Sequence, residues 1–337
     1  MYKIIDSINS PEDVKALQKR DLAVLCDELR QYIIECCATN PGHLGSSLGA
    51  VEIAVALHRV FDTPADKIVW DVGHQAYAHK IITGRREEFR NQRRKGGICG
   101  FPKMNESPYD AFGVGHASTS ISAALGMAVA DNLSGRSAHH IAVIGDGALT
   151  GGLAFEGINN AGSRRSNLLV IVNDNRMSID APTGGLHKHL LYITTSAKYN
   201  RIKNGIWHKV GDGLRSLGRA VTKGLKRVIL RSNTTASEAV SMFESLGFRY
   251  FVPTDGNNID TLIPFLERLR NIDGPKLLHL VTVKGKGYAP AEANPSGWHA
   301  PGKFTPDTGE KKPSGGIIDK YQVVFGETIT ELARADS

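Results

Sequence analysis

Two short apolar runs, each followed at once by glycine or by oxygen-bearing side chains, constrain this sequence more than any other feature. Residues 139–144 run into Gly-Asp-Gly at 145–147, and residues 167–172 run into Asn-Asp-Asn at 173–175. Apolar runs of this length, bounded by turn residues, are typical of buried strands. In open α/β sheets, ligands bind at the carboxyl ends of the strands. The two runs therefore predict a sheet with a ligand site at that edge.

The stretches on either side of these runs alternate between helical and extended patterns. Residues 19–38 carry Leu22, Leu25, Leu29 and Ile33 at steps of three and four, the spacing of one helix face. Alternation of this kind predicts an α/β fold, a mostly parallel sheet with helices on both faces. The other expected helices lie at 50–60, after Gly-Asp-Gly through about residue 161, at 236–246, at 259–270 and from about Tyr321 onward. Strands are expected at 67–71, 248–252 and 276–283, a break at 40–45, a loop at 85–103, and an ordered excursion or linker at 285–316.

Composition narrows the class of protein. The chain has 337 residues, more than the roughly 100–200 of a typical domain, so one large domain or two smaller ones are expected. With 41% hydrophobic and 22% charged residues it can bury a sizeable core. No apolar run approaches the roughly 18 residues of a membrane span, and the start lacks the pattern of a secretory signal. Cys26, Cys36, Cys37 and Cys99 show no CxxC spacing, which favours reduced thiols. We expect a soluble, cytoplasmic protein.

The positive charge is concentrated between Lys198 and Arg231, where ten basic residues stand against a single acid, Asp212. A basic amphipathic helix can lie on an anionic membrane surface, or it can cover the protein's own core with a solvated basic face; we favour the second reading. Charge confined to one segment with few aromatic residues also argues against a nucleic-acid partner. The apolar residues that recur there at steps of four and three are Val210, Leu214, Leu217, Val221, Leu225 and Val228.

The residues that follow the two strand-like runs have the chemistry of a magnesium–diphosphate site. Asp146 and Asn175 supply hard oxygen ligands of the kind that Mg²⁺ prefers, with phosphates and water completing its six positions. The glycines around Asp146 allow a ligand to approach the backbone, and a following helix offers N–H groups to phosphate. Alone, a Gly-Asp-Gly is more often a turn. The pair of polar segments after two strands is much more specific.

Six stretches carry a resemblance to a known family. The chain resembles the 1-deoxy-D-xylulose-5-phosphate synthase family of transketolase-like thiamine-diphosphate enzymes, from about residue 10 almost to its last residue. The matching stretches are Pro-Gly-His-Leu-Gly-Ser-Ser-Leu-Gly at 41–49, Trp-Asp-Val-Gly-His-Gln-Ala-Tyr-Ala-His-Lys at 70–80, Gly-His-Ala-Ser-Thr-Ser at 115–120, Gly-Asp-Gly-Ala-Leu-Thr at 145–150, Asn-Asp-Asn-Arg-Met-Ser-Ile at 173–179 and Lys-Gly-Lys-Gly-Tyr-Ala-Pro at 284–290.

The resemblance implies roles for individual residues of this chain. It implies that Mg²⁺ is bound by the side chains of Asp146 and Asn175 and by the carbonyl of Met177. It also implies a cofactor, thiamine diphosphate, and catalytic histidines that face its thiazolium ring and the substrate. The implied catalytic residues are His43, His74 and His299, and the implied cofactor-binding residues are His74, Gly115, His116, Ala117, Gly147, Ala148, Asn175 and Tyr288.

These side chains also have structural alternatives. Each histidine alone could cap a turn or be satisfied in the core, and Tyr288 could pack as an aromatic residue in a Gly-rich loop; imidazole, however, suits proton transfer near neutral pH. The remaining histidines at 79, 187, 189 and 279 are expected to be structural. The sequence departs from the family at 255–258, where Asp-Gly-Asn-Asn replaces the usual Asp-Gly-His, so no role of that histidine is carried over to this chain.

The family condenses pyruvate with D-glyceraldehyde 3-phosphate and releases CO₂, with the thiazolium as electron sink. Family members are about twice as long and dimeric, and their second domain, which binds the pyrimidine ring, carries an essential glutamate. We therefore expect residues 1–316 to form the diphosphate domain, with a basic mobile segment at 183–231 as a cover, and residues 317–337 to begin the second domain. Such a chain should not turn over alone.

Other readings remain. The chain could be a fragment, which we favour, or one half of a two-chain enzyme with the pyrimidine-binding domain on a partner. It could instead belong to a split transketolase or to a 2-oxo-acid decarboxylating complex. A third reading, of another class, is a non-catalytic module that binds diphosphate for regulation or partner assembly.

Overall fold

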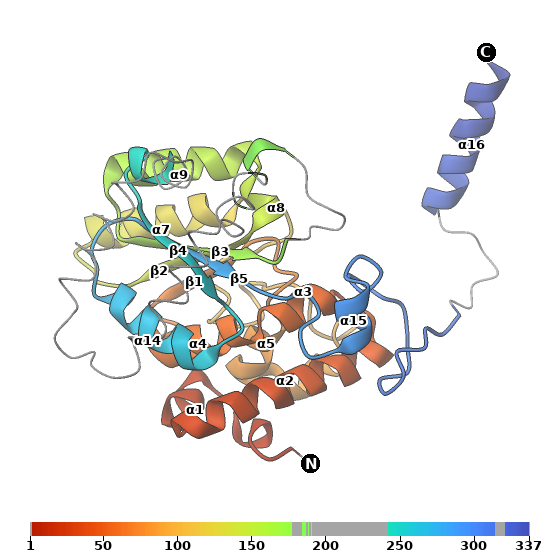
Figure 1. Cartoon of the computed structure of the whole chain (residues 1–337), viewed down its shortest axis with the longest axis horizontal. Coiled ribbons are helices and arrows are strands. Elements are labelled where there is room, and N and C mark those ends of the chain that lie inside the picture. Colours follow the sequence, from red (N-terminus) through yellow and green to blue (C-terminus); the bar gives the residue numbers. More distant parts are fainter. Residues whose placement is uncertain are drawn as a thin grey trace.

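The core of the molecule is a five-stranded parallel sheet in the order β1-β2-β3-β5-β4 (Figure 1). The structure is a computed structural model, and it describes residues 2–176, 184–186, 188, 190, 242–313 and 321–336. The expected fold class is confirmed. The strands are β1 (Lys67–Trp70), β2 (His140–Gly145), β3 (Leu168–Asp174), β4 (Arg249–Asp255) and β5 (Lys276–Val281).

The register of the sheet brings the polar segments of the sequence to one edge. β2 and β3 pair from His140 with Leu168 to Gly145 with Asn173, so both strands end at the same level. β5 continues this alignment on the other side of β3, where Asp174 pairs with Val281. The residues that follow all three strands are therefore neighbours, as the two apolar runs predicted.

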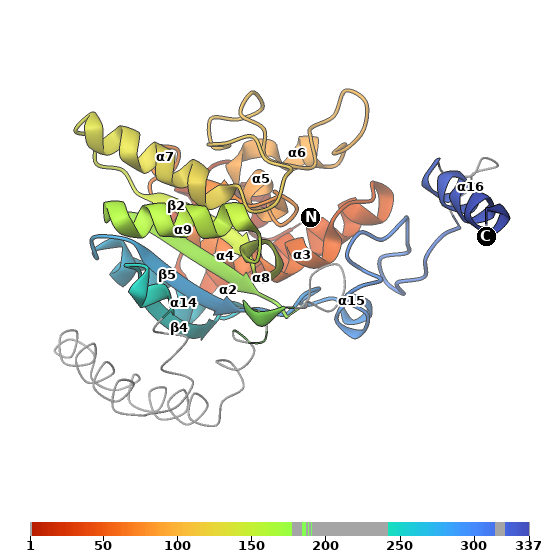
Figure 2. The same cartoon turned by 90° about the horizontal axis from the view of Figure 1, so that it is seen from above.

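Helices cover both faces of the sheet (Figures 1 and 2). One face carries α7, α8 and α9, and the other carries α2, α4 and α14. The helical elements are η1 (Ile5–Ser7), α1 (Pro11–Ala16), α2 (Lys19–Thr39), α3 (Leu44–Gly49), α4 (Val51–Val60), α5 (Tyr77–Lys80), η2 (Ile81–Arg85), α6 (Arg86–Phe89), α7 (Ser120–Leu133), α8 (Asp146–Leu149), α9 (Gly152–Arg164), α14 (Ile259–Arg270), α15 (Ala289–Ala293) and α16 (Tyr321–Ala335).

The strands send alternate side chains into two separate cores, because successive residues of a strand point to opposite faces. In β3, Leu169 and Ile171 belong to the core under α2, α4 and α14. Leu168, Val170 and Val172 belong to the core under α7 and α9. All seven residues of β3 are buried, as expected of a central parallel strand covered on both sides.

Most expected elements are present within a few residues of their predicted bounds. The predictions missed α7, a helix of fourteen residues, and they placed a loop over 85–103 where α6 lies. The helix expected through about residue 161 is divided into α8 and α9, and the break after residue 40 gives way to α3 at Leu44. The helix expected at 236–246, the basic segment at 183–231 and Met177 lie wholly or largely outside the described residues.

The excursion at 285–316 is ordered by aromatic packing in its described part. Tyr288, Trp298 and Phe304 are buried, and their ring centroids lie 4.9 to 5.9 Å apart. α16 differs, because none of its residues is buried although Tyr321, Phe325 and Leu332 are large and apolar. None of the helices that the structure describes is both long enough and apolar enough to cross a membrane.

The cysteines carry free thiols, as expected. Cys26, Cys36 and Cys37 belong to α2 and are buried in the core, whereas Cys99 is half-buried. Burial raises the pKa of the Cys36 thiol to about 12 and raises the pKa values of Cys26 and Cys37 well above their usual range. These three thiols stay protonated at neutral pH, so they are unreactive.

Candidate functional site

Asp146 stands at the carboxyl edge of the sheet as a buried carboxylate. It follows β2 directly, begins α8, and is only 4% exposed. Burial and the neighbouring Asp174 raise its pKa to about 7, although N–H groups of Gly147 and of Asp146 itself and the Lys284 ammonium act in the opposite direction. A carboxylate held in this way gains most from a nearby cation.

Asn175 lies one residue beyond β3, at the same edge as Asp146. A carboxylate and an amide oxygen on neighbouring strand ends form a donor set of the kind that suits Mg²⁺. In the described part of the chain no cluster of three or more His, Cys, Asp or Glu side chains gathers around a metal position. A magnesium ion that also draws on carbonyl, phosphate and water oxygens needs no such cluster, so the residues present fit the implied metal.

Three buried side chains next to Asn175 are linked by hydrogen bonds, those of Asp174, His279 and Tyr250. His279 Nε2 lies 2.8 Å from Asp174 Oδ2, and His279 Nδ1 lies 2.8 Å from the Tyr250 hydroxyl. Asp174 Oδ1 accepts a hydrogen bond of 3.0 Å from the backbone N–H of Arg176, whose φ is +59°. Burial alone would raise the pKa of Asp174, but the hydrogen bond from His279 holds it below its usual value. His279 is thus structural, as expected, and it supports the turn that presents Asn175.

A second set of hydrogen bonds links the end of β3 to the segments that follow β1 and β5. Asn173 donates to Gln75 Oε1 at 2.8 Å, and its own oxygen accepts from the Thr282 hydroxyl at 2.6 Å. Gln75 follows β1, Asn173 lies in β3, and Thr282 follows β5. These bonds fix the segments relative to one another across the site.

Lys284 is a site residue that the sequence interpretation did not single out. Its side chain is buried, and its ammonium acts on the pKa values of Asp146, His74 and His299. Lys284 therefore lies close to Asp146 and to two of the histidines, His74 and His299. The Lys-Gly-Lys-Gly pattern at 284–287 was the available signal, because a lysine beside glycines after a strand is suited to bind phosphate.

The three predicted catalytic histidines come together although they are far apart in sequence. The ring centroids of His43 and His299 are 5.3 Å apart, and His74 lies 5.7 Å from His43 and 5.9 Å from His299. Burial and the neighbouring His299 lower the pKa of His43 to about 4, while burial and His43 lower that of His74 to about 3. Burial and Lys284 also lower the pKa of His299. All three imidazoles are neutral at pH 7.

The backbone around these histidines is fixed by contacts between segments. The N–H of His43 donates to the Tyr77 hydroxyl, and the Ser47 hydroxyl donates to the carbonyl of His74, both at 2.9 Å. Within the described residues, the buried Nδ1 atoms of His74 and His299 have no hydrogen-bond partner. Two polar atoms of this kind at one site are available to a ligand.

The two glycine-containing segments predicted to line the cofactor also meet. Gly115, His116 and Ala117 are exposed, and the Ser118 hydroxyl that follows them donates to the carbonyl of Ala148 at 2.7 Å. The segment at 115–117 is thereby held beside Gly147 and Ala148. Their predicted contacts with a cofactor remain predictions.

Tyr288 and the altered motif at 255–258 have visible structural roles. The Tyr288 hydroxyl donates to the carbonyl of Pro306 at 3.0 Å, so Tyr288 is part of the aromatic cluster of the excursion. Asn257 donates to the Glu52 carboxylate at 3.0 Å and to the carbonyl of Gly49 at 3.1 Å, and it accepts from the N–H of Val283. Asn257 therefore joins α4 to the segment that leads to Lys284.

The fold with this site at its carboxyl edge is that of the transketolase-like enzymes. The crystal structure of transketolase from Campylobacter jejuni matches with a TM-score of 0.61 and 19% identity, over 84% of this chain and 41% of that chain. A transketolase variant from Pichia stipitis matches with a TM-score of 0.60 and 18% identity, over 93% of this chain and 44% of that chain.

Sequence comparison places the chain more narrowly. Residues 5–282 match the family described as 1-deoxy-D-xylulose-5-phosphate synthase, and the chain belongs to that family. The synthase of Porphyromonas gingivalis is 52% identical over 99% of this chain, and that of Chlorobaculum tepidum is 48% identical over 99%. In both cases the match covers 53% of the relative, so this chain spans about half the length of the proteins it resembles.

Proposed function

We propose that this chain is the cofactor-binding part of an enzyme that condenses pyruvate with D-glyceraldehyde 3-phosphate, with loss of CO₂, to form 1-deoxy-D-xylulose 5-phosphate. The observation that carries the proposal is a buried carboxylate, Asp146, at the carboxyl edge of the sheet, together with three histidines whose ring centroids lie 5.3 to 5.9 Å apart and a buried Lys284 close to both groups. This arrangement has the groups needed to hold a metal–diphosphate at one end and to move protons at the other.

Thiamine diphosphate with Mg²⁺ fits the donors at this edge. The side chains of Asp146 and Asn175 and the carbonyl of Met177 would hold the metal. The backbone at Gly147 and Ala148 would meet the diphosphate, with Gly115, His116, Ala117, His74 and Tyr288 along the rest of the cofactor. When bound, the cofactor supplies an electron sink for decarboxylation of a 2-oxo acid.

The chain's own contribution at the reacting end is a set of neutral proton acceptors. Burial lowers the pKa values of His43, His74 and His299, so each imidazole is uncharged at neutral pH and keeps one ring nitrogen that can accept a hydrogen bond or a proton from a bound ligand. Lys284 adds a fixed positive charge beside them, which favours anionic groups such as a carboxylate or a phosphate.

The domain organisation belongs to the same proposal. Residues 1–316 would form the diphosphate domain, with the basic segment at 183–231 as a cover, and residues 317–337 would begin a pyrimidine-binding domain. That domain would belong to a longer chain or to a partner chain, in a homodimer of the complete enzyme. The exposed apolar side chains of α16 support this assignment, because a helix of this kind is stabilised by packing against another surface.

Calorimetric titration of the chain tests the cofactor assignment. Thiamine diphosphate with Mg²⁺ should bind, and thiamine without the diphosphate should not. Asp146→Asn and Asn175→Ala should each weaken binding by at least about tenfold, the loss of roughly 1.4 kcal/mol. Asn159→Ala, on the exposed side of α9, is the matched control and should bind like the unchanged chain. Equal binding by all three variants would contradict the proposed site.

A product assay separates the proposed reaction from the alternatives. The chain is joined to the remaining half of the Porphyromonas gingivalis synthase and supplied with pyruvate or a ketose donor and with several aldehydes. Consumption of pyruvate only with D-glyceraldehyde 3-phosphate supports the proposal. Use of a ketose donor would instead indicate a transketolase, the class of enzyme whose solved structures share the fold of this chain. Cofactor binding without any product would indicate a non-catalytic module.

A further inference from the structure

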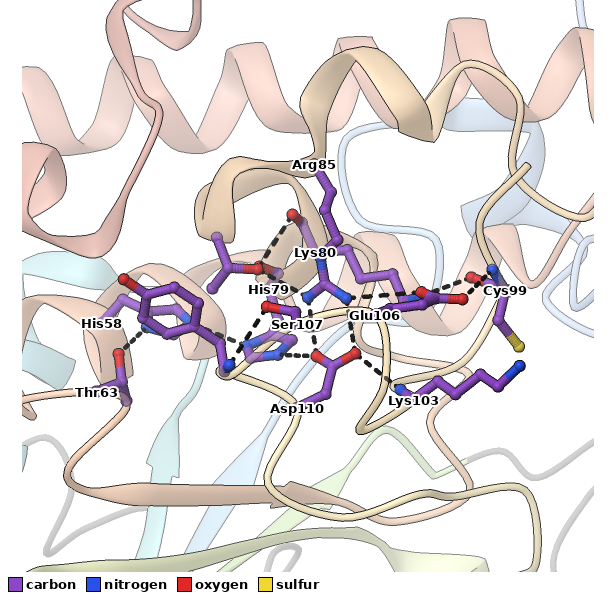
Figure 3. A network of polar contacts seen from close by, with 12 residues as sticks. His58, Thr63, His79, Lys80, Arg85, Cys99, Lys103, Glu106, Ser107 and Asp110 are labelled. Carbon is purple, nitrogen blue, oxygen red and sulfur yellow. Dashed lines mark hydrogen bonds and ion pairs between the residues drawn. The ribbon is translucent and has the colours of Figure 1, made fainter. Parts of the chain in front are cut away.

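A loop that leads into the proposed site is held against the core by buried ion pairs (Figure 3). Asp110, whose side chain is 0% exposed, accepts from both Arg85 Nη atoms at 2.6 and 2.8 Å. The same carboxylate lies 3.0 Å from His79 Nε2 and accepts from the backbone N–H of Lys103 at 2.7 Å. Its two oxygens thus hold four donors, from η2, α5 and the loop itself.

A second ion pair fixes the beginning of the same loop. Lys80 Nζ, on a side chain that is 0% exposed, lies 2.7 Å from Glu106 Oε2 and donates to the carbonyl of Cys99 at 2.6 Å. The other oxygen of Glu106 accepts from the N–H of Cys99 at 2.6 Å. Ion pairs removed from water contribute little net stability, because desolvation offsets their attraction. A geometric role explains such a cluster better than stability does.

The direction of each hydrogen bond in the cluster is fixed by Asp110. Burial would raise the pKa of Asp110, but hydrogen bonds from His79 and Arg85 bring it well below its usual value, so the carboxylate is ionised. His79 must then donate from Nε2 and accept at Nδ1, which lies 2.9 Å from His58 Nε2. His58 in turn accepts at Nδ1 from the Thr63 hydroxyl at 3.0 Å. Both imidazoles are neutral, and in each of them the proton is on Nε2, so each has one permitted tautomer.

The loop held in this way continues into the proposed site. Phe101 lies with its ring centroid 5.5 Å from that of His43. Pro102 packs over Gly73, the residue before His74, so closely that a methyl group at Gly73 would come within 2.8 Å of Pro102 Cδ. Beyond Asp110 come the exposed residues 115–117, and then the N–H groups of Ser118 and Ser120, which donate to Asp71 at 2.8 and 3.0 Å.

We infer that Asp110 is a positioning residue: through Arg85 and His79 it holds the segment 99–119 so that Phe101 lies against His43 and residues 115–117 border the site before any ligand binds. Asp71 fixes the far end of this segment and Asp110 its middle, so residues 111–117 are held from both sides. The inference rests on the proposed function only for what then binds there.

Amide hydrogen exchange of the unliganded 337-residue chain tests the inference with a matched pair of variants. Asp131 is also a carboxylate bonded to an arginine and a histidine, Arg136 and His140, but it lies near the carboxyl end of α7, beside the amino end of β2. Asp110→Asn should accelerate exchange over residues 111–119 by at least about tenfold, while strand β3 stays protected. Asp131→Asn should leave residues 111–119 unchanged.

The outcome separates positioning from general destabilisation. Acceleration in β3 as well as in the loop, or equal exchange at 111–119 in the two variants, would overturn the inference. If Asp110→Asn does not fold, Arg85→Lys takes its place, because a lysine keeps the charge but cannot make the two-pronged contact. It should accelerate the same amides, and Asp110→Glu should restore part of the protection.

Cofactor titration of the same variants distinguishes this inference from the proposed function. Asp110→Asn should bind thiamine diphosphate with Mg²⁺ at least about fivefold more weakly than Asp131→Asn, because the site then has to be ordered during binding. Failure of the unchanged chain to bind would end the proposed function, and the exchange data would still decide the role of Asp110. Equal affinities would overturn the role of Asp110 at the site.

Discussion

At two positions of the site, backbones lie so close together that only a glycine fits between them. A methyl group at Gly45 would lie 2.9 Å from the carbonyl oxygen of Trp298, and one at Gly49 would lie 2.9 Å from that of Val283. The N–H of Gly45 donates to the same Trp298 carbonyl, and the carbonyl of Gly45 accepts from Gly285. These glycines let α3 lie directly against the segment that carries Lys284 and His299.

Gly45→Ala should therefore disturb the site from a distance. The added methyl group has to push the Trp298 carbonyl away, which we expect to cost about 1–3 kcal/mol of stability and to weaken cofactor binding. Gly126→Ala is the control, because Gly126 is exposed on α7 with open space around it and an alanine there should stabilise the helix by about 0.5–1 kcal/mol. Urea unfolding measures both, and an unchanged Gly45→Ala protein would refute the close contact.

Asn257 shows how one amide can replace the histidine that the resemblance led us to expect. Its amide donates to Glu52 and Gly49, so an aspartate at this position would lose both donations and bring two carboxylates together. Asn257→Asp should cost about 2–3 kcal/mol, since buried polar groups lose their partners. Asn159→Asp, at an exposed position of α9, should change stability by less than about 0.5 kcal/mol. Thermal unfolding of the two variants makes the comparison, and similar melting temperatures would contradict it.

At the scale of elements, the sequence predicted best the helices whose apolar residues form a single stripe. α14 begins and ends at the predicted residues, because Ile259, Leu262, Leu266 and Leu269 are its buried face. α7 was missed because small and apolar residues lie all around the helix and hide its buried face, which is formed by Ile121, Ala124, Leu125 and Ala128. Its only other signals were Ser120 at the start and Gly135 just beyond its end.

The candidate site was predictable only in part for a similar reason. Asp146 and Asn175 could be placed together, because both follow strands and the edges of parallel strands coincide. The gathering of His43, His74 and His299 could not be derived from periodicity, since each lies in or beside a loop whose path depends on tertiary contacts such as Gly45 with Trp298. Here the family motifs supplied what local patterns lack.

The hydrogen bonds that align the strand ends give a prediction at this scale. Thr282→Val keeps the shape of the side chain but removes the hydroxyl that donates to Asn173, leaving a buried oxygen unsatisfied. We expect a loss of about 1–3 kcal/mol and weaker Mg²⁺-dependent cofactor binding. Thr261→Val, which removes a hydroxyl bonded to the Asn258 carbonyl at the start of α14, should weaken stability without changing cofactor affinity. Calorimetric titration distinguishes the two, and equal affinities would count against the role of Thr282.

At the scale of the whole molecule, the burial of histidines links folding to pH. In the unfolded chain these imidazoles take up protons below pH 6.5, whereas burial, the main cause in each case, lowers their pKa values in the folded protein. Stability is thus at its full value above pH 6.5 and falls as the pH decreases toward 4. The described histidines with lowered pKa values are His43, His58, His74, His79, His139, His140 and His299.

Calorimetry between pH 8 and pH 5 should therefore show a melting temperature that decreases with pH, together with uptake of protons on unfolding. The contribution of Asp110, whose pKa is lowered, is lost only below the ordinary value of 3.8 and does not act within the measured range. Asp146, whose pKa is raised to about 7, takes up a proton in the folded protein as the pH decreases and so opposes the trend, but it is one carboxyl against seven imidazoles. His43→Asn should flatten the profile, whereas His116→Gln, at an exposed position, should not. A melting temperature that rises toward pH 5 would contradict the prediction.

The distribution of thiols has a practical consequence for following the loop that Asp110 holds. Three of the four cysteines are shielded and protonated, so a maleimide-linked fluorophore should attach at Cys99 without any prior mutagenesis. Cys99 is joined through its backbone to Lys80 and Glu106, at the beginning of that loop. The native chain thus provides a single attachment point for a fluorophore. Its emission would report, in real time, whether the loop keeps its position when ligands bind and dissociate.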